Sequence, residues 1–504
     1  MGWYPPSVRR SLVFVAAFVL ARGARAADVN ATPATLDAVL PTLAPGDTVH
    51  LAAGHYAHFS VTNMNGTPAQ WITITSDVAQ AAVVDADPGP CCNTIEISGS
   101  SYVAIENLLV DGHDVDGAFG VSASDGATPT HDIRIENDSF VNHHGSQQHD
   151  AISTKTPTWG WIIRHNSITD AGTGLYLGNS NGDDPFIGGL IEDNLVENPI
   201  GYCMEIKFQN PRPSVAGMPT SPVTTIIRDN VFIKNDDPSP DGDRPNLLVG
   251  GFPASGNGSQ DRYEIYGNFF FHNPRESLMQ ASGRVTIHDN VFVDSAVKAI
   301  ALQDQDLPLE QAFVYDNTIY GVPTGIDFAS AAPQGDAVFG NLVFSANPIA
   351  GTISDQRDNL TDSVANAATY VNTPSTTLGS MDFYPKTGQC TGSAMDTSKV
   401  SADTDYAIDF NGTSRGSFTY RGAYAGSGAN PGWTLQAGIK TATTSSGDGG
   451  APGDASASAD GSASDGGTEG GGGGCGCSVE PTRSASSWLL LALGALTWRR
   501  SRRR

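Results

Sequence analysis

The stretch Ile227-Arg228-Asp229-Asn230-Val231-Phe232 is the clearest copy of a sequence motif, here called the Asn phrase, that recurs along the chain. The phrase is an apolar residue, two polar residues, Asn or Asp, one further residue and a second apolar residue. Other copies lie at residues 135–140, 163–168, 191–196, 265–270, 287–292, 314–319 and 338–343, with a shorter one at 105–109. The seven intervals between its polar positions, residues 138 to 341, average 29 residues. A repeat of this length predicts a stacked solenoid.

The repeats are rich in β-branched and aromatic residues and are bounded by Gly, Asn and Asp, which is typical of short strands. No helical periodicity runs between them. We therefore expect an all-β fold, a right-handed parallel β-helix in which each coil buries its apolar residues against its neighbours. Asn at a turn tolerates the left-handed conformation, and the repeated Asn is expected to stack into a ladder of amide hydrogen bonds.

Composition limits the classes of partner. The chain has 504 residues, a formal net charge of −25 and only 16% charged residues. This acidic balance argues against nucleic acid, because no basic stripe is available to replace the counterions of phosphates. An acidic polysaccharide would need a local basic site or a bridging cation. Six widely spread cysteines indicate neither a disulfide framework nor a zinc site.

The N-terminus has the pattern of a signal peptide over residues 1–26. Arg9 and Arg10 precede the apolar run Leu12–Leu20, and Ala24-Arg25-Ala26 is a small-x-small cleavage site. We therefore expect a secreted protein. A cap helix should follow, with Thr32 as its N-cap and Pro33 as its first residue, covering the open end of the solenoid.

We divide the mature chain into a β-helix domain at 27–440, with repeats at about 95–345 and a C-terminal cap at 346–440. A disordered Gly/Ser/Asp linker follows at 441–474. Residues 475–504 contain Cys475-Gly476-Cys477, an apolar run and an Arg cluster. This tail is similar to the myxobacterial C-terminal sorting tails, which implies display at the cell surface. A plain membrane anchor is the alternative, and in both cases only the tail contacts a membrane.

The opening turn and strands, Pro45–Leu51, Gly54-His55-Tyr56 and Trp71–Ile74, resemble those of secreted right-handed β-helix proteins. These include polysaccharide lyases of the alginate lyase and chondroitinase B type. The resemblance covers about residues 34–345 and implies that polysaccharide is the partner. We expect the protein to be a monomer.

Two adjacent repeat intervals, 194 to 230 and 230 to 268, are longer than the others. Extra residues in a solenoid leave as loops. We place these insertions at about 209–222 and 234–262, side by side, as the walls of a groove beside the functional site.

Side-chain alternation indicates which residues face this site. In the strand that starts at Met204, it predicts that Glu205, Lys207 and Gln209 point outward. The same reasoning places Lys155 and Tyr176 outward on the preceding coils. Arg212 and Arg244 come from the insertions, and Asp183 and Asp184 from the loop after Tyr176.

In the lyases that this chain resembles, a strand Lys is the base, an Arg on the following coil assists it, and acidic residues hold Ca²⁺. Lys207 matches the Lys place. The following coil carries no Arg, and the nearest is Arg244. We therefore predict the following roles: catalytic residues Lys207, Arg244 and Lys155; substrate-binding residues Tyr176, Gln209 and Arg212; Ca²⁺ ligands Glu205, Asp183 and Asp184.

Other interpretations fit the same residues. Lys207 can simply be a solvated lysine paired with Glu205. Asp183, Asp184 or Glu205 could form the carboxylate pair of a glycoside hydrolase. A non-catalytic surface protein could bind glycans through aromatic and amide groups, with Tyr176, Gln209 and Phe252 as candidates. Three histidines in one polar loop, His143, His144 and His149, are either metal ligands or ordinary loop residues.

Overall fold

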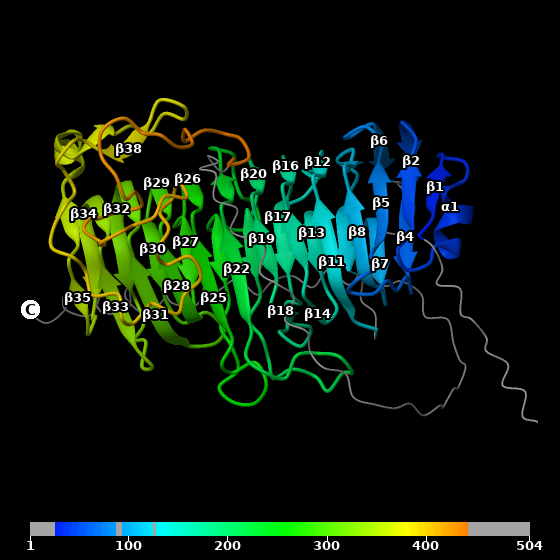
Figure 1. Ribbon diagram of the computed structural model, residues 1–504, viewed down its shortest axis with the longest axis horizontal. Coiled ribbons are helices and arrows are strands. Elements are labelled where there is room, and N and C mark those ends of the chain that lie inside the picture. Colours follow the sequence, from blue (N-terminus) through cyan, green and yellow to red (C-terminus); the bar gives the residue numbers. More distant parts are fainter. Residues whose placement is uncertain (1–25, 87–92, 124–127, 442–504) are drawn as a thin grey trace, which may run out of the picture.

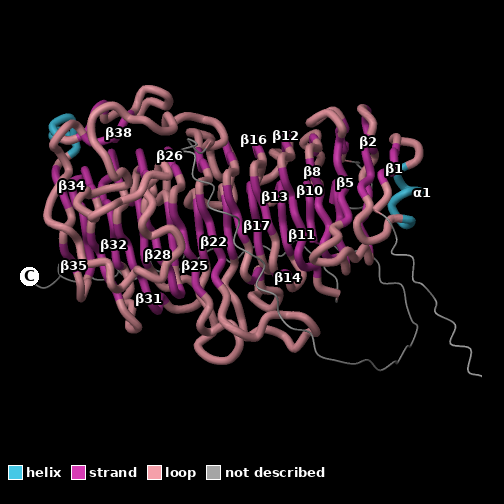
Figure 2. The backbone as a smooth tube through the Cα atoms, in the orientation of Figure 1, coloured by secondary structure: helices cyan, strands magenta, loops and turns pink. Residues whose placement is uncertain are grey.

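The structure, a computed structural model, describes residues 26–86, 93–123 and 128–441. The chain winds as a right-handed parallel β-helix, and each coil contributes strands to three faces, A, B and C (Figures 1 and 2). Among the described strands only β37 and β38 pair antiparallel. The predicted fold class is confirmed.

Face A contains β1 (Asp28–Ala31), β2 (Thr48–Leu51), β5 (Ile72–Ser76), β8 (Ser101–Glu106), β11 (Thr130–Glu136), β15 (Ile162–Arg164), β19 (Leu190–Glu192), β22 (Thr224–Arg228), β25 (Arg262–Tyr266), β28 (Gly283–His288), β31 (Leu309–Tyr315), β33 (Asp336–Phe339) and β35 (Gln356–Arg357), with β14 (Thr158–Trp159) and β18 (Phe186–Ile187) beside it. Face B contains β3 (Gly54–Tyr56), β6 (Ala82–Asp85), β9 (Leu109–Asp111), β12 (Ser139–Val141), β16 (Ser167–Thr169), β20 (Leu195–Glu197), β23 (Val231–Ile233), β26 (Phe269–Asn273) and β29 (Val291–Ser295). Face C contains β4 (Phe59–Thr62), β7 (Asn93–Ser98), β10 (Phe119–Ala123), β13 (Asp150–Thr154), β17 (Thr173–Leu177), β21 (Met204–Ile206), β24 (Leu247–Val249), β27 (Met279–Ala281) and β30 (Lys298–Leu302). The long strands β32 (Thr318–Phe328) and β34 (Leu342–Gly351) bend from face B into face C, and β36 (Leu360–Asp362) follows on face B.

Alternation along each strand builds the core. In β22, Thr225 and Ile227 are buried while their neighbours are half-buried on the outside. The parallel register places Ile227 between Ile191 and Ile265 of the adjacent coils, and all three side chains are fully buried. Like residues therefore stack on like residues, and one hydrophobic core runs through the solenoid.

The repeated Asn forms the expected ladder at the corner between faces A and B. The backbone N–H and Nδ2 of Asn194 both donate to Oδ1 of Asn230, at 3.1 and 2.9 Å. Nδ2 of Asn194 also donates to the carbonyl of Ile163 on the preceding coil. Equivalent bonds join Asn166, Asn194, Asn230, Asn268, Asn290, Asn317, Asn341 and Asn359.

The left-handed backbone of this corner lies one residue before the Asn and not at the Asn itself. Asp193, Asp229 and Asp289 have φ of 54°, 57° and 54°, and Gly267 takes the same place with 68°. The preceding residue absorbs the turn, which leaves the Asn side chain free to point inward and join the ladder.

The helix at the N-terminal end is shorter than expected. Helix α1 (Leu36–Val39) is followed by the 3₁₀ helix η1 (Leu40–Thr42), and the N-cap is Thr35 rather than Thr32. Leu36 and Leu40 are buried in the end of the solenoid core. The element therefore covers the first coil, as a cap should.

Residues 364–441, which we call the C-terminal strap, turn back along the outside of the solenoid (Figure 1). The strap begins with the 3₁₀ helix η2 (Val364–Thr369) and contains β37 (Val371–Thr373) and β38 (Asp382–Pro385). Its Phe383, Phe410 and Trp433 belong to a second hydrophobic cluster, together with outward side chains of face B such as Phe269. The strap therefore covers the outer side of face B over the later coils.

Several expectations fall on residues that the structure does not describe. The signal peptide, except for its last residue, and nearly all of the linker and tail lie in 1–25 and 442–504. Within the described ranges, no helix has the length and apolar character needed to span a bilayer.

Candidate functional site

The outer side of face C carries an aligned row of side chains in its middle coils. Parallel register places Ser153, Tyr176 and Glu205 next to one another on β13, β17 and β21. The alternate positions, Ile152 and Leu175 among them, are fully buried in the core. Because neighbouring strands are about 4.8 Å apart, side chains of three consecutive coils meet in this row.

Two lysines lie on either side of Tyr176. The Nζ atoms of Lys155 and Lys207 are each 5.8 Å from the centroid of the Tyr176 ring. Lys155 Nζ also lies 4.2 Å from the centroid of the Phe119 ring. Both distances fall in the range of cation–π attraction. The structure therefore brings together Lys155, Tyr176 and Lys207, as alternation predicted.

Each lysine has a carboxyl partner. Lys207 Nζ lies 2.8 Å from Glu205 Oε1, and Lys155 Nζ lies 3.8 Å from Asp150 Oδ2. Both carboxyl side chains are about 95% buried, while Lys155 is 31% exposed and Lys207 14%. We call Asp150, Lys155, Tyr176, Glu205 and Lys207 the Tyr176 cluster.

Burial alters the acid–base chemistry of this cluster. It raises the pKa of Asp150 to about 7, although Lys155 opposes the rise, and the Glu205 carboxylate adds to it. Burial and then Glu205 also raise the pKa of the Tyr176 phenol well above its usual value. Asp150 can therefore exchange a proton near neutral pH, whereas Tyr176 keeps its proton and can donate a hydrogen bond.

Arg244 lies on the loop that precedes β24. Its guanidinium carbon is 5.6 Å from the centroid of the Tyr202 ring, and Nη2 donates to the carbonyl of Asp241. The loop is held by Gln147, which lies three coils earlier: Gln147 Nε2 donates to the carbonyl of Gly242, and Asp241 N–H donates to Gln147 Oε1, both at 2.9 Å. Burial and then the Glu205 carboxylate raise the pKa of the Tyr202 phenol, and Arg244 opposes the rise, so charges from the loop and from β21 both act on Tyr202.

The insertions stand side by side only in part. The interval assigned to the second one contains strand β24, which belongs to face C. Its first part, before β24, contacts Gln147, while its second part contacts the first insertion through Arg212 and Asp261. These loops therefore project from two corners, and Figure 1 shows green loops extending beyond β14 and β18.

Two residues expected to bind substrate have structural partners instead. Arg212 forms a buried ion pair with Asp261 and donates to the carbonyl of Pro219 at 2.6 Å. Gln209 is buried and its Nε2 donates to the carbonyl of Phe186 at 2.9 Å. Phe252, considered for glycan binding, is buried against Tyr263.

The carboxylates expected to hold Ca²⁺ do not converge. Asp183 accepts from Asn210 Nδ2 at 2.7 Å, and Asp184 accepts from Asn179 Nδ2 at 2.8 Å. Glu205 is engaged by Lys207. A Ca²⁺ ion needs six to eight oxygen ligands around one point, and this set does not supply them.

Two of the three loop histidines are packed inside the protein. His143 and His149 are buried, and burial lowers the pKa of His143 to about 4. His149 Nε2 accepts from the N–H of Gly117. Within the described residues, ligand atoms suited to a metal converge only in Asp85, Asp111 and His113, on the first coils and away from the Tyr176 cluster.

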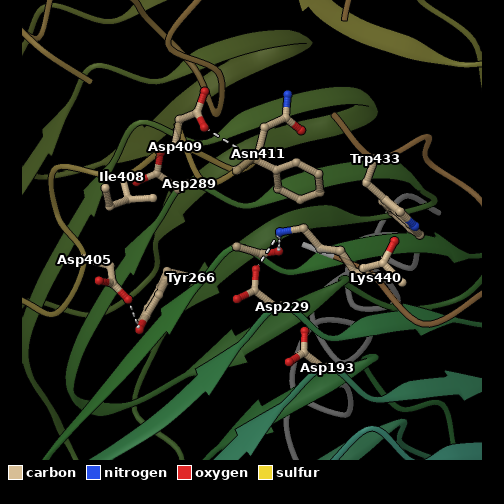
Figure 3. Close-up of a pocket in the computed structure, with 14 residues that line it drawn as sticks. Asp193, Asp229, Tyr266, Asp289, Asp405, Ile408, Asp409, Asn411, Trp433 and Lys440 are labelled. Carbon is tan, nitrogen blue, oxygen red and sulfur yellow. Dashed lines mark hydrogen bonds and ion pairs between the residues drawn. The ribbon is translucent and has the colours of Figure 1, made fainter. Parts of the chain in front are cut away.

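A pocket of about 100 Å³ lies between the strap and the corner of faces A and B (Figure 3). It is lined by Asp193, Asp229, Tyr266, Gly267, Asp289, Asp405, Ile408, Asp409, Phe410, Asn411, Gly412, Trp433, Lys440 and Thr441. Lys440 Nζ lies 2.5 Å from Asp229 Oδ1 and donates to the carbonyl of Gly267 at 2.8 Å. Lys440 of the strap thus places a positive charge among the carboxyl groups that line this pocket.

Sequence reasoning missed Phe119, Tyr202 and the role of Asp150. Asp150 stands at the start of β13, but its position beside His149 suggested a polar loop. Phe119 is the first residue of β10 and pairs in register with Asn93 of β7. Aligning the face C strands, rather than only the Asn phrase, would have placed Phe119 and Asp150, whereas Tyr202 precedes β21.

No family model matches this chain, and no curated protein matches it. Some solved structures are similar. An alginate lyase from Paenibacillus sp. str. FPU-7 is 16% identical, with a TM-score of 0.36, over 67% of this chain and 99% of the lyase. The pectate lyase Pel9A is 13% identical, with a TM-score of 0.45, over 82% of this chain and 96% of that enzyme. The A-module of the mannuronan C-5 epimerase AlgE4 from Azotobacter vinelandii is 17% identical, with a TM-score of 0.40, over 66% of this chain and 91% of the module.

Proposed function

We propose that the Tyr176 cluster binds an acidic polysaccharide and cleaves it by β-elimination. The observation that carries this proposal is the pair of lysines, Lys155 and Lys207, that flank Tyr176 on the outer side of face C. The whole chain is strongly acidic, so this local group of cations, with Arg244 beside it, is an unusual feature that a polyanion would recognise.

The arrangement also favours an extended ligand. Lys155 follows β13 and Lys207 follows β21, with the coil of β17 between them. Two coil steps separate strands by about 10 Å. A ligand that meets both lysines therefore carries negative groups spaced along its length and lies across the coils, parallel to the solenoid axis.

Elimination at a uronate requires three actions. A base takes the proton on the carbon next to the carboxylate, the electron pair forms a carbon–carbon double bond, and the bond to the 4-linked oxygen breaks. That oxygen leaves with a proton, and a cation stabilises the charge that builds on the carboxylate. In our proposal Lys207, in its neutral form, takes this proton and becomes an ammonium, while Lys155 and Arg244 face the carboxylate. Tyr176, which lies between the lysines, gives its phenol proton to the leaving oxygen. Solvent then returns a proton to Tyr176 and takes one from Lys207, so both groups are restored. The proposal assigns no step to Ca²⁺, because Glu205, Asp183 and Asp184 do not converge on one point.

A second function, non-catalytic binding of an acidic glycan, is favoured by the close Lys207–Glu205 pair. Lys207 Nζ lies 2.8 Å from Glu205 Oε1, so it makes an ion pair as a cation does, and a cation suits the binding of an anionic ligand. The same face and the same lysines would carry that function.

The test is to incubate the purified protein with a panel of uronate polysaccharides, with Ca²⁺ or with a chelator, and to follow the ultraviolet absorbance of the unsaturated product. We expect absorbance to rise with one substrate, with or without Ca²⁺, and not to rise for Lys207→Ala. Lys298→Ala is the matched control, because Lys298 lies on face C but pairs with Asp327 at 2.6 Å. No product from any polysaccharide, together with retention on one of them, would leave the binding function.

We also propose that the protein is secreted and held at the cell surface. The patterns of residues 1–26 and 475–504 support this location. Labelling of intact cells with a membrane-impermeant reagent tests it, and an unlabelled protein would contradict it.

A further inference from the structure

One group of the Tyr176 cluster has no part in the reaction described above. Asp150 is the first residue of β13, and only 5% of its side chain is exposed. Its Oδ2 atom lies 3.8 Å from Lys155 Nζ, too far for a close hydrogen-bonded pair such as Lys207 and Glu205 make. Asp150 is thus a buried carboxyl directly behind a lysine that faces solvent.

The titratable side chains around Asp150 come from three strands. Lys155 follows its own strand, Tyr176 lies on β17, and Glu205 lies on β21. His149 precedes Asp150, but its ring faces Gly117 and Asp116, and burial lowers its pKa, so it adds no charge near neutral pH. Neighbouring β10 contributes Phe119, which is uncharged.

The proton on Asp150 changes the net charge of the site. Within the Tyr176 cluster, Lys155 and Lys207 balance Asp150 and Glu205 when both carboxyls are ionised. With Asp150 protonated, the cluster carries one excess positive charge. From this geometry we infer that Asp150 is a proton-operated control on the site: it weakens the hold on an anionic polysaccharide when ionised and strengthens it when protonated. This inference rests on the proposed function.

Thermodynamic linkage between proton binding and ligand binding gives the direction in which affinity changes with pH. Burial, opposed by Lys155 and assisted by Glu205, raises the pKa of Asp150 to about 7. An anion beside Lys155 favours the protonated carboxyl, so binding takes up a proton and affinity falls as pH rises through neutrality. Each unit by which the ligand raises this pKa corresponds to a tenfold change in affinity.

Binding of a sulfated dextran oligosaccharide tests the inference, because this probe is a polyanion without a uronate that elimination could cleave. Calorimetry at about pH 6 and about pH 8 should show affinity that is several-fold, up to about tenfold, weaker at the higher pH. In Asp150→Asn, which is nearly isosteric and cannot titrate, affinity should stay high at both values. Any pH dependence that remains in this variant belongs to the histidines, which it retains.

Three results would overturn the inference. The first is wild-type affinity that does not fall between the two pH values, which decides the matter even if Asp150→Asn fails to fold. The second is an Asp150→Asn variant with the full wild-type pH dependence. The third is an absence of binding, or binding that Lys155→Ala and Lys207→Ala leave unchanged. That last result contradicts the proposed function itself, whereas the first two leave it standing.

Discussion

At the residue scale, the Asn ladder contains one exception, Asp138. Its backbone N–H donates to Asn166 Oδ1, and its Oδ1 accepts from the N–H of Leu108 at 2.7 Å. Its Oδ2 is buried and has no hydrogen-bond partner among the described residues. Burial raises the pKa of Asp138 well above its usual value, so the carboxyl is protonated and fills a place where every other rung has an NH₂ group.

Asp138→Asn should therefore stabilise the protein, by about 1–3 kcal/mol near neutral pH. The folded protein binds this proton more tightly than the unfolded chain, whose Asp has a pKa of about 3.9. The stability that protonated Asp138 contributes is complete below about pH 4 and is lost as pH rises toward the folded-state pKa. In urea unfolding experiments, the difference in unfolding free energy between Asp138→Asn and wild type should increase over the same pH range.

Asn194→Asp is the reverse control, because it places a second carboxyl in the ladder. We expect it to lower stability, and to lower it more at higher pH. An Asp138→Asn protein that is less stable than wild type at about pH 8 would show that Asp138 is ionised and paired in a way that the ladder geometry does not provide.

Sequence patterns predicted the position of some site residues and not of others. Alternation placed Tyr176, Glu205 and Lys207 correctly, because they lie on or directly beside regular strands. It failed for Gln209, because β21 ends at Ile206 and alternation has no meaning beyond the end of a strand. Side chains in the following loops are placed by tertiary contacts, such as the Arg212–Asp261 ion pair, that no local pattern reveals.

At the element scale, the strap was expected only as a cap, although the sequence carries a signal for its path. In β12, Ser139-Phe140-Val141, a polar residue precedes the inward Phe140. In β23 and β26, Val231-Phe232-Ile233 and Phe269-Phe270-Phe271 are apolar throughout. Continuous apolar runs indicate strands that are buried on both faces. The partner segment itself is irregular, so its contacts with face B could not be read from periodicity.

Lys440 fastens the end of the strap. Its ammonium contacts Asp229 and the carbonyl of Gly267, lies 3.8 Å from the centroid of the Phe410 ring, and is almost fully buried. Lys440→Ala should cost about 1–3 kcal/mol, less than a fully buried pair because Asp229 is partly exposed. Limited proteolysis should then cut within residues 404–441 faster than in the wild type.

Lys399→Ala is the control for this prediction. Lys399 also lies on the strap and pairs with Asp355 at 2.7 Å, but it is 43% exposed, so its loss should cost less than about 1 kcal/mol. Equal proteolysis of both variants and the wild type would mean that Lys440 does not hold the strap.

At the scale of the whole molecule, the repeat interval correctly indicated a solenoid, because the Asn phrase occurs once per coil. Interval length alone could not show that the extra residues before Asn268 lie on both sides of strand β24 and form two loops. The site could be assigned to face C near β17 and β21 from the sequence. Its acid–base character could not, because the pKa of Asp150 depends on burial that only the assembled coils create.

The strap makes the two halves of the solenoid different. It covers the outer side of face B from β20 onward, whereas β9, β12 and β16 lie outside the cluster that it forms. Opening of a covered coil also requires release of the strap, so backbone amides in β23, β26 and β29 should exchange with deuterium more slowly than those in β9, β12 and β16. Hydrogen exchange with mass spectrometry measures this, and uniform exchange along face B would contradict it.

The central claim is that face C around Tyr176 holds an acidic polysaccharide. Its most direct test is the affinity of the purified protein for a uronate oligosaccharide, compared among wild type, the Lys155→Ala/Lys207→Ala double variant and Lys298→Ala. We predict a loss of about tenfold or more in the double variant, equivalent to about 1.4 kcal/mol, and none in Lys298→Ala. Wild-type affinity in the double variant, or an equal loss in Lys298→Ala, would show that the ligand does not meet these lysines.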